Sequence, residues 1–251
     1  MQVLVNNHVV SYESKGTGPV VLMLHGWADT KNTFQPVLHE FTKYRVIAVD
    51  LPGFGGSGAP DTAWGLPEYA QFTADFLKKI HIDPHKLAIV IGHSNGGAVA
   101  VYGIAHNNFS VDKLILLSAA GIRSSDAIKK QLLKFTAKTG KVLTFVLPKN
   151  QKQKLKATFY KKIKSDLLIA PHMHETFKKI VSHDVLQDSQ KIKIPTLLIY
   201  GNQDAQTPLH YGQKFAAVMP HSKLITINGA GHFMHQTHTE QVSNAIQDFL
   251  K

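Results

Sequence analysis

The sequence predicts an α/β domain, in which a mostly parallel β-sheet carries helices on both faces and a helical segment is inserted into it. Two observations support this prediction. Short apolar runs alternate with helical patterns in the first part of the chain and again near its end, which is typical of a parallel sheet covered on both sides. Between these parts lies a lysine-rich segment with few convincing strands, punctuated by Pro148 and Pro171.

The strands are predicted where short aliphatic runs are bounded by turn residues: 19–24, 45–49, 87–91, 113–117, 195–200 and 223–227. A hairpin around Asn6-Asn7 is predicted at the sheet edge, with strands at 3–5 and 9–12. Helical spacing of apolar residues indicates four helices outside the middle segment: 66–80, 98–106, 209–218 and 239–250. Within that segment, helical patterns occupy 127–139, 151–163 and 174–182.

The domain organisation follows from these elements. We assign 1–121 and 194–251 to the core and 122–193 to a basic helical cap, or lid. Open α/β sheets place ligands at the carboxyl ends of their strands. An insertion that leaves the end of the 113–117 strand is therefore expected to cover that edge.

The formal net charge of +11 is concentrated in the middle of the chain. Residues 121–194 contain 17 Lys/Arg and 5 Asp/Glu, whereas the remainder contains 11 and 12. The lysines lack interleaved aromatics on a recognisable binding module, so a nucleic-acid partner is not expected. Two readings of the basic cap stay open: it attracts an anionic or lipid-like substrate, or it only keeps the insertion soluble.

Several function classes are disfavoured by composition. The chain has no cysteine, which excludes disulfides, thiolate nucleophiles and cysteine-ligated metals. The histidine clusters, His172 with His174 and His232 with His235 and His238, lack a matched set of carboxylates, so neither a metal nor another cofactor is expected. The first residues do not resemble a signal peptide, and no apolar run approaches the ~20 residues of a membrane span. We expect a cytoplasmic protein without stable membrane insertion.

A nucleophile motif directly follows the strand that ends at Ile91. Gly92-His93-Ser94-Asn95-Gly96-Gly97 is G-x-S-x-G between a strand and a helix, which is the context that this motif requires. The sharp turn strains the serine backbone and needs neighbours without a Cβ. Ser94 is therefore the candidate nucleophile, and the start of the next helix faces developing negative charge.

A serine nucleophile needs a histidine base that is oriented by a carboxylate. Asp204 follows the 195–200 strand and His232 follows the last strand, in the chain order Ser, Asp, His of this kind of fold. Asp126 lies after the preceding strand and is the alternative acid. For the oxyanion hole we expect the backbone N–H groups of Trp27 and Asn95. The Trp27 ring could instead serve in packing at the mouth of a pocket.

The chain resembles the α/β-hydrolase superfamily over essentially its full length. The matching pieces are His25-Gly26-Trp27, Asp50-Leu51-Pro52-Gly53-Phe54-Gly55-Gly56-Ser57, the Ser94 motif, Gly201-Asn202-Gln203-Asp204 and Gly231-His232. The resemblance implies a serine hydrolase, and carboxylic ester hydrolysis is the default among the many activities that this fold carries. In such an enzyme the cap residues Phe135, Leu143, Phe145, Leu147 and Phe159 line or shield an acyl pocket.

The same resemblance leaves alternatives. Dehalogenases and epoxide hydrolases of this fold use an aspartate where this chain has Ser94. C–C bond hydrolases of meta-cleavage products share the size and the cap but usually carry Trp after the catalytic His, where this chain has Phe233; Arg123 is the only arginine of the cap region. Haloperoxidase-like members share the triad, so perhydrolysis is a further side activity to consider. A ligand receptor with slow hydrolysis is the non-enzymatic reading. The natural substrate and the oligomeric state are not encoded in these motifs.

Overall fold

The structure is a computed structural model of the 251-residue chain and describes residues 1–123 and 173–251. The chain divides into two compact units, 1–122 with 175–251, and 123–174. The first unit carries the sheet, and residues 175–193, which the sequence assigned to the cap, belong to this unit. The helical patterns at 127–139 and 151–163 lie outside the described residues, so the cap stays a prediction.

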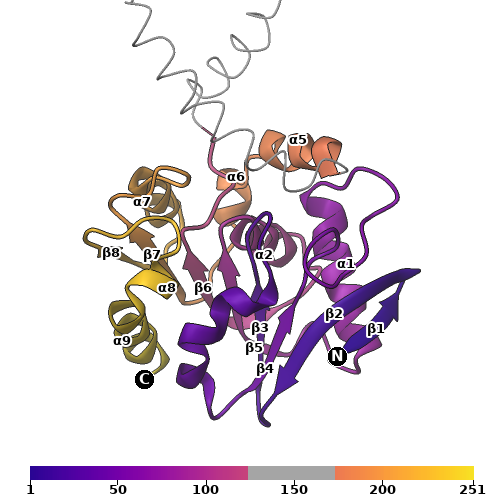
Figure 1. Cartoon of the computed structure of the whole chain (residues 1–251). Helices are drawn as coiled ribbons and strands as arrows, with labels where there is room; N and C mark the ends of the chain where they lie inside the picture. The colour runs from indigo at the N-terminus through magenta and orange to yellow at the C-terminus, as the bar shows by residue number, and fades with distance from the viewer. Residues whose placement is uncertain (124–172) are drawn as a thin grey trace, which may run out of the picture. The chain divides into compact units, whose positions relative to one another are not determined.

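The first unit is built on an eight-stranded sheet with the order β1-β2-β4-β3-β5-β6-β7-β8 (Figure 1). The N-terminal hairpin occupies the edge, where β1 pairs antiparallel with β2 and β2 pairs antiparallel with β4. Each pair from β4 to β8 in that order is parallel. This confirms the predicted fold class and the predicted hairpin. The strands are β1 Gln2–Val5, β2 His8–Lys15, β3 Val20–Leu24, β4 Arg45–Val49, β5 Leu87–His93, β6 Val111–Leu117, β7 Thr196–Gly201 and β8 Ser222–Ile227.

The helices predicted within the described residues are present within a few residues of their predicted bounds. They are α1 Leu66–Lys79, α2 Asn95–Ala105, α5 His174–Ser182, α7 Leu209–Val218 and α9 Thr239–Leu250. Two single-turn helices, α6 Leu186–Ser189 and α8 Met234–Thr237, were not predicted. Neither was η1, a 3₁₀ helix over Lys31–Phe41 that contains Pro36 and buries Phe34, Val37 and Phe41.

Helices close the sheet on both faces because alternate strand residues point in opposite directions. On one face, Val21, Met23, Ile89 and Ile91 form a core with the buried side chains of η1 and α9. On the other face lie α1, α2 and α7, and Gly212 of α7 packs so closely that an added Cβ would come within 2.6 Å of the Tyr200 ring. Both faces are thus apolar, as the nearly continuous aliphatic strands require.

The carboxyl ends of the parallel strands meet at one edge of the sheet. The loops that follow β3, β5, β6, β7 and β8 therefore emerge side by side, although they are far apart in the sequence (Figure 1). Every residue predicted for catalysis in the described part of the chain lies in these loops. Among the described helices, none is long and apolar enough to cross a membrane.

Candidate active site

Ser94 occupies the turn between β5 and α2 in a backbone conformation that non-glycine residues rarely adopt, with φ 49° and ψ −116°. The turn is tied to the end of β6 on both sides. The Ser94 N–H donates to the Leu117 carbonyl at 3.0 Å, and the Ser94 carbonyl accepts from the Ala120 N–H at 2.9 Å. These bonds hold the partly exposed Ser94 side chain at the sheet edge.

The glycines around Ser94 are required by close backbone approaches. A Cβ added to Gly96 would lie 2.0 Å from the Leu24 carbonyl oxygen, and one added to Gly92 would lie 2.5 Å from the Gly97 Cα. Neither position can therefore hold another residue without displacing the backbone. This is the physical basis of the strand–turn–helix geometry that the motif predicts.

Asp204 follows β7 and is almost completely buried, at 5% exposure. Its Oδ1 accepts the backbone N–H groups of Gln206 at 2.7 Å and Thr207 at 3.0 Å. Burial opposes ionisation, but hydrogen bonds from His232 and Thr207 outweigh it, and the pKa of Asp204 lies well below its usual range. Asp204 is therefore a carboxylate at neutral pH.

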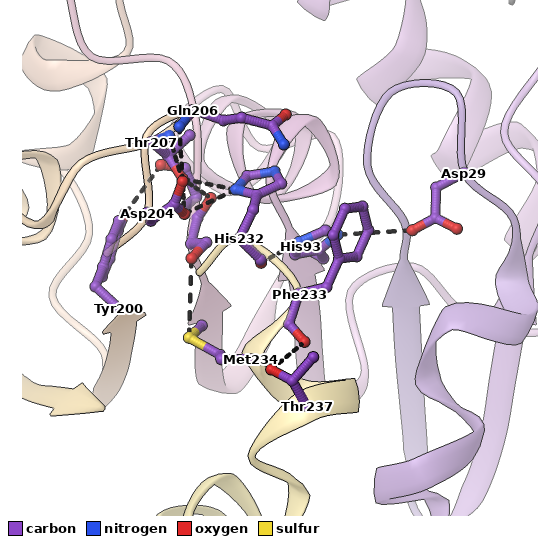
Figure 2. Close-up of polar contacts among 12 residues, drawn as sticks. Asp29, His93, Tyr200, Asp204, Gln206, Thr207, His232, Phe233, Met234 and Thr237 are labelled. Carbon is purple, nitrogen blue, oxygen red and sulfur yellow. Dashed lines mark hydrogen bonds and ion pairs between the residues drawn. The ribbon is translucent and has the colours of Figure 1, made fainter. Parts of the chain in front are cut away.

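His232 follows β8, and its Nδ1 lies 2.8 Å from Asp204 Oδ2 (Figure 2). Because a carboxylate oxygen can only accept, His232 Nδ1 carries the proton of this bond. A neutral ring then has an unprotonated Nε2, which is the form that accepts a proton from a nucleophile. The structure thus brings together two residues that the sequence placed in separate loops.

His93, the residue before Ser94, links the nucleophile turn to the His232 loop. Its Nε2 lies 3.1 Å from the His232 carbonyl oxygen and donates to it, and the two imidazole rings lie 4.8 Å apart (Figure 2). Burial, together with His235 and His232, lowers the pKa of His93 well below its usual range, so the ring is neutral. His93 occupies a variable position of the G-x-S-x-G motif, and no local sequence pattern indicates this contact.

His235 connects the segment that follows His232 to η1. It is fully buried, and its Nε2 pairs with Thr33 Oγ1 of η1 at 2.9 Å. Burial, with a smaller contribution from His232, lowers the pKa of His235 to about 4. The His235 ring is therefore uncharged at neutral pH.

The loop after β3 is held by His25. The Leu51 N–H donates to His25 Nε2 at 2.9 Å, so the ring proton sits on Nδ1, which donates to the Gly26 carbonyl at 2.7 Å. Burial lowers the pKa of His25, which keeps the ring neutral. In a trans peptide the C=O and the following N–H point in opposite directions. The Trp27 N–H consequently points away from His25.

Gly26 lies directly against the nucleophile turn. A Cβ added to it would come within 3.1 Å of Ser94 Cβ. The Trp27 ring packs edge-on against Phe54 at 4.8 Å and lies 5.0 Å from Phe177 of α5. The Trp27 ring therefore packs against two aromatic rings, and its place at the mouth of a pocket stays a prediction.

A partly buried ion pair fixes the neighbouring 50–57 loop to the same region. Asp50 accepts from Lys31 Nζ at 2.6 Å, from the Lys31 N–H at 2.8 Å and from the Gly56 N–H at 3.0 Å. Burial opposes ionisation, but these donors hold the pKa of Asp50 below its usual value. These contacts give Asp50 a structural role in the Asp50–Ser57 stretch, which is one of the pieces that match the α/β-hydrolase superfamily.

Two sets of predicted residues cannot be placed. Asp126, the alternative acid, and the apolar cap residues Phe135, Leu143, Phe145, Leu147 and Phe159 lie outside the described residues. Within the described ranges 1–123 and 173–251, no group of three or more His, Cys, Asp or Glu side chains could hold a metal ion.

Comparison with known families agrees with this architecture. The model of the alpha/beta hydrolase family matches residues 21–245. The chain therefore belongs to the alpha/beta hydrolase family, which confirms the resemblance seen in its motifs.

Its relatives are distant but align over nearly the whole chain. The AB hydrolase superfamily protein YisY of Bacillus subtilis is 28% identical, with 96% of each chain covered. A pimeloyl-[acyl-carrier protein] methyl ester esterase of Xanthomonas oryzae pv. oryzae is 26% identical over 94% of this chain and 96% of the esterase. A 2-hydroxy-6-oxo-6-(2'-aminophenyl)hexa-2,4-dienoic acid hydrolase of Metapseudomonas resinovorans is 25% identical, with 95% and 86% covered.

Solved structures share the fold. The crystal structure of a putative lipase from Acinetobacter baumannii superimposes with a TM-score of 0.77 at 21% identity, covering all of this chain and 90% of the lipase.

Proposed function

We propose that this protein is a serine hydrolase that cleaves carboxylic esters through an acyl-enzyme intermediate. In this proposal Ser94 is the nucleophile, His232 is the general base and Asp204 is the acid that orients it. The observation that carries the proposal is the 2.8 Å bond between His232 Nδ1 and the buried Asp204 carboxylate, on the sheet edge that also presents the strained Ser94 turn.

The reaction follows from the protonation states. Ser94 Oγ attacks the ester carbonyl carbon while its proton moves to His232 Nε2, and Asp204 stabilises the imidazolium. The tetrahedral intermediate collapses, the C–O bond to the alcohol breaks, and the alcohol leaves with the proton from His232. Water then attacks the acyl-Ser94 ester by the same route, which releases the acid and restores the serine.

The negative charge of the tetrahedral intermediate needs two N–H donors. We assign these to Asn95, the first residue of α2, and to Trp27. The first N–H groups of a helix have no partner within the helix, and the helix dipole favours an anion there. The hydrogen bond from His25 Nδ1 to the Gly26 carbonyl supports the second donor. It directs that carbonyl towards His25, so the Trp27 N–H of the same peptide points away from His25.

Replacing His25 by Gln is expected to lower kcat about 10²- to 10³-fold, which is the usual cost of one oxyanion donor. Gln places an oxygen near the position of Nε2, so it can still accept from Leu51, but it lacks a donor at the position of Nδ1. His25→Asn does the reverse and should keep most of the activity. Steady-state kinetics on one ester, with thermal melting as the folding control, compares the two. Equal losses in both variants would contradict the proposed orientation of the Trp27 peptide.

The ester activity itself is tested with p-nitrophenyl esters from acetate to palmitate. We expect turnover with a chain-length optimum, and labelling of Ser94 by a p-nitrophenyl alkylphosphonate, located by peptide mass spectrometry. Release of p-nitrophenol together with a Ser94 adduct supports the proposal. The absence of turnover on every ester, with Ser94 unlabelled, would overturn it.

The second candidate is C–C bond hydrolysis, because a relative of similar identity is named as a hydrolase of a 2-hydroxy-6-oxohexa-2,4-dienoic acid. Phe233 lies where such hydrolases are expected to carry Trp. The residue is 37% exposed, and the centre of its ring lies 5.3 Å from that of the His232 ring. The matching test follows the dienolate absorbance with a substrate of that class. Faster cleavage of the dienolate than of any ester would favour this candidate.

A further inference from the structure

Thr207, in the loop between β7 and α7, lies at the centre of the polar contacts around Asp204 and His232. Its side chain is buried, and its Oγ1 lies 2.8 Å from Asp204 Oδ2, 2.9 Å from the Ser118 carbonyl oxygen and 3.1 Å from His232 Nδ1 (Figure 2). No motif in the sequence marked this residue. Its contacts connect the end of β6 to the loops after β7 and β8.

The Thr207 hydroxyl contacts one oxygen of the Asp204 carboxylate, and backbone N–H groups contact the other. Asp204 Oδ1 is already held by two backbone N–H groups, whereas Oδ2, the oxygen that faces His232, has His232 and Thr207 as its only partners among residues 1–123 and 173–251. Without the hydroxyl, Oδ1 would keep its two backbone donors, but Oδ2 would keep only His232 as a partner among the described residues. Thr207 therefore lies in contact with the oxygen that faces the imidazole ring.

The number of protons on the Thr207 hydroxyl limits the hydrogen bonds that it can donate. It has one proton and two lone pairs, and both the Ser118 carbonyl and Asp204 Oδ2 can only accept. When the proton points to Ser118, a lone pair of Thr207 faces the His232 Nδ1–H, which is then shared between the carboxylate and the hydroxyl. When it points to Asp204, it stabilises the charge of the carboxylate. In both arrangements the oxygens around Nδ1 favour a proton there and leave Nε2 free.

The anchor of this network is itself unusual. Ser118 follows β6 with a positive φ of 44°, and its N–H donates to the Ile199 carbonyl at 2.9 Å. A non-glycine residue in this region carries strain that the surrounding structure must maintain. The strained backbone aims the Ser118 carbonyl at Thr207, which is an observation independent of the Asp204 contacts.

We propose that Thr207 is a positioning residue, whose hydroxyl holds Asp204 Oδ2 and the His232 ring in the geometry that general-base catalysis needs. This inference rests on the proposed function for its kinetic consequence. Its structural consequence, the state of the His232 Nδ1 proton, does not require turnover.

The test compares Thr207→Val, which has the same shape without the hydroxyl, with Thr207→Ser, which keeps it. We expect Val to lower kcat about 10- to 100-fold, the effect of one hydrogen bond to a charged group, with KM changed little. Ser should restore kcat to within a few fold. Thr73→Val is the matched control, because Thr73 is also buried and its hydroxyl bonds to one backbone carbonyl, at Tyr69 on α1. That control should lower the melting temperature without lowering kcat.

A spectroscopic readout separates this inference from the ester proposal. The His232 Nδ1 proton should give a low-field proton NMR resonance in the full-length protein, assigned by its loss in His232→Gln. We expect the resonance to move or broaden in Thr207→Val and to persist in Thr207→Ser, even if no ester is a substrate. An unchanged resonance in Thr207→Val would overturn the inference. Equal losses of kcat in Thr207→Val and Thr207→Ser, each accompanied by an equal loss of stability, would also overturn it. If Val fails to fold, Thr207→Ala against Thr207→Ser gives the same comparison.

Discussion

Ser94→Ala is expected to reduce kcat/KM for the best p-nitrophenyl ester by about 10⁴-fold or more, since removal of the nucleophile of such a triad has costs of this order. The change deletes one oxygen from a partly exposed side chain. It leaves the turn intact, because the Leu117 and Ala120 hydrogen bonds use only the Ser94 backbone. The melting temperature should therefore stay close to that of the wild type while the activity falls to the residual level of oxyanion binding.

Ser243→Ala is a matched control for this result. Ser243 lies on α9, it is buried, and its hydroxyl has no hydrogen-bond partner in the described part of the chain. Its removal should leave ester turnover unchanged. If Ser94→Ala keeps more than about a hundredth of the activity with the fold intact, well above what such a variant retains, then hydrolysis proceeds without the serine and the nucleophile is wrongly assigned.

The sheet could be predicted because buried parallel strands consist of nearly continuous runs of aliphatic residues. β4 was predicted at its observed bounds, and β5 and β6 were each predicted two residues short, since a strand continues into residues whose side chains no longer carry the pattern. The 3₁₀ helix η1 was missed. Its interior holds Pro36, which reads as a helix breaker, although the surrounding Phe34, Val37 and Phe41 are buried against the sheet.

Topology was enough to predict that Asp204 and His232 lie at one sheet edge, although it left Asp126 as the alternative acid. Each residue follows the carboxyl end of a parallel strand, and these ends converge whatever the side chains around them are. The prediction needed no knowledge of distances. It required only the chain order of the three residues and the positions of the strand ends.

The supporting residues could not be anticipated in this way. His93 contacts a carbonyl 139 positions away, and Thr207 contacts a carbonyl 89 positions away. Such contacts leave no periodicity, and a threonine in a turn is the ordinary expectation for a loop. The roles of His93 and Thr207 depend on the directions of individual protons and lone pairs. These directions are known only from the folded structure, in which the loops lie together.

The acid assignment leads to the second large effect. Asp204→Asn is expected to lower kcat by about 10⁴-fold, because the amide would hold His232 in the wrong tautomer. The backbone N–H groups of Gln206 and Thr207 need an acceptor at the position of Oδ1, so the amide oxygen must occupy that position. The NH₂ group then faces His232 and donates to Nδ1. The ring proton moves to Nε2, and the base can no longer accept the proton of Ser94.

Asp126→Asn provides the comparison, because the chain order alone left Asp126 as the alternative acid. That variant should keep most of the wild-type kcat, whereas Asp204→Asn should lose it while KM changes little. Ester kinetics and melting temperatures of both proteins decide between the two carboxylates. If Asp126→Asn lost its activity and Asp204→Asn kept it, the catalytic acid would be Asp126, which follows β6 in the sequence. The His232–Asp204 hydrogen bond would then serve only to hold the loop after β8 in place.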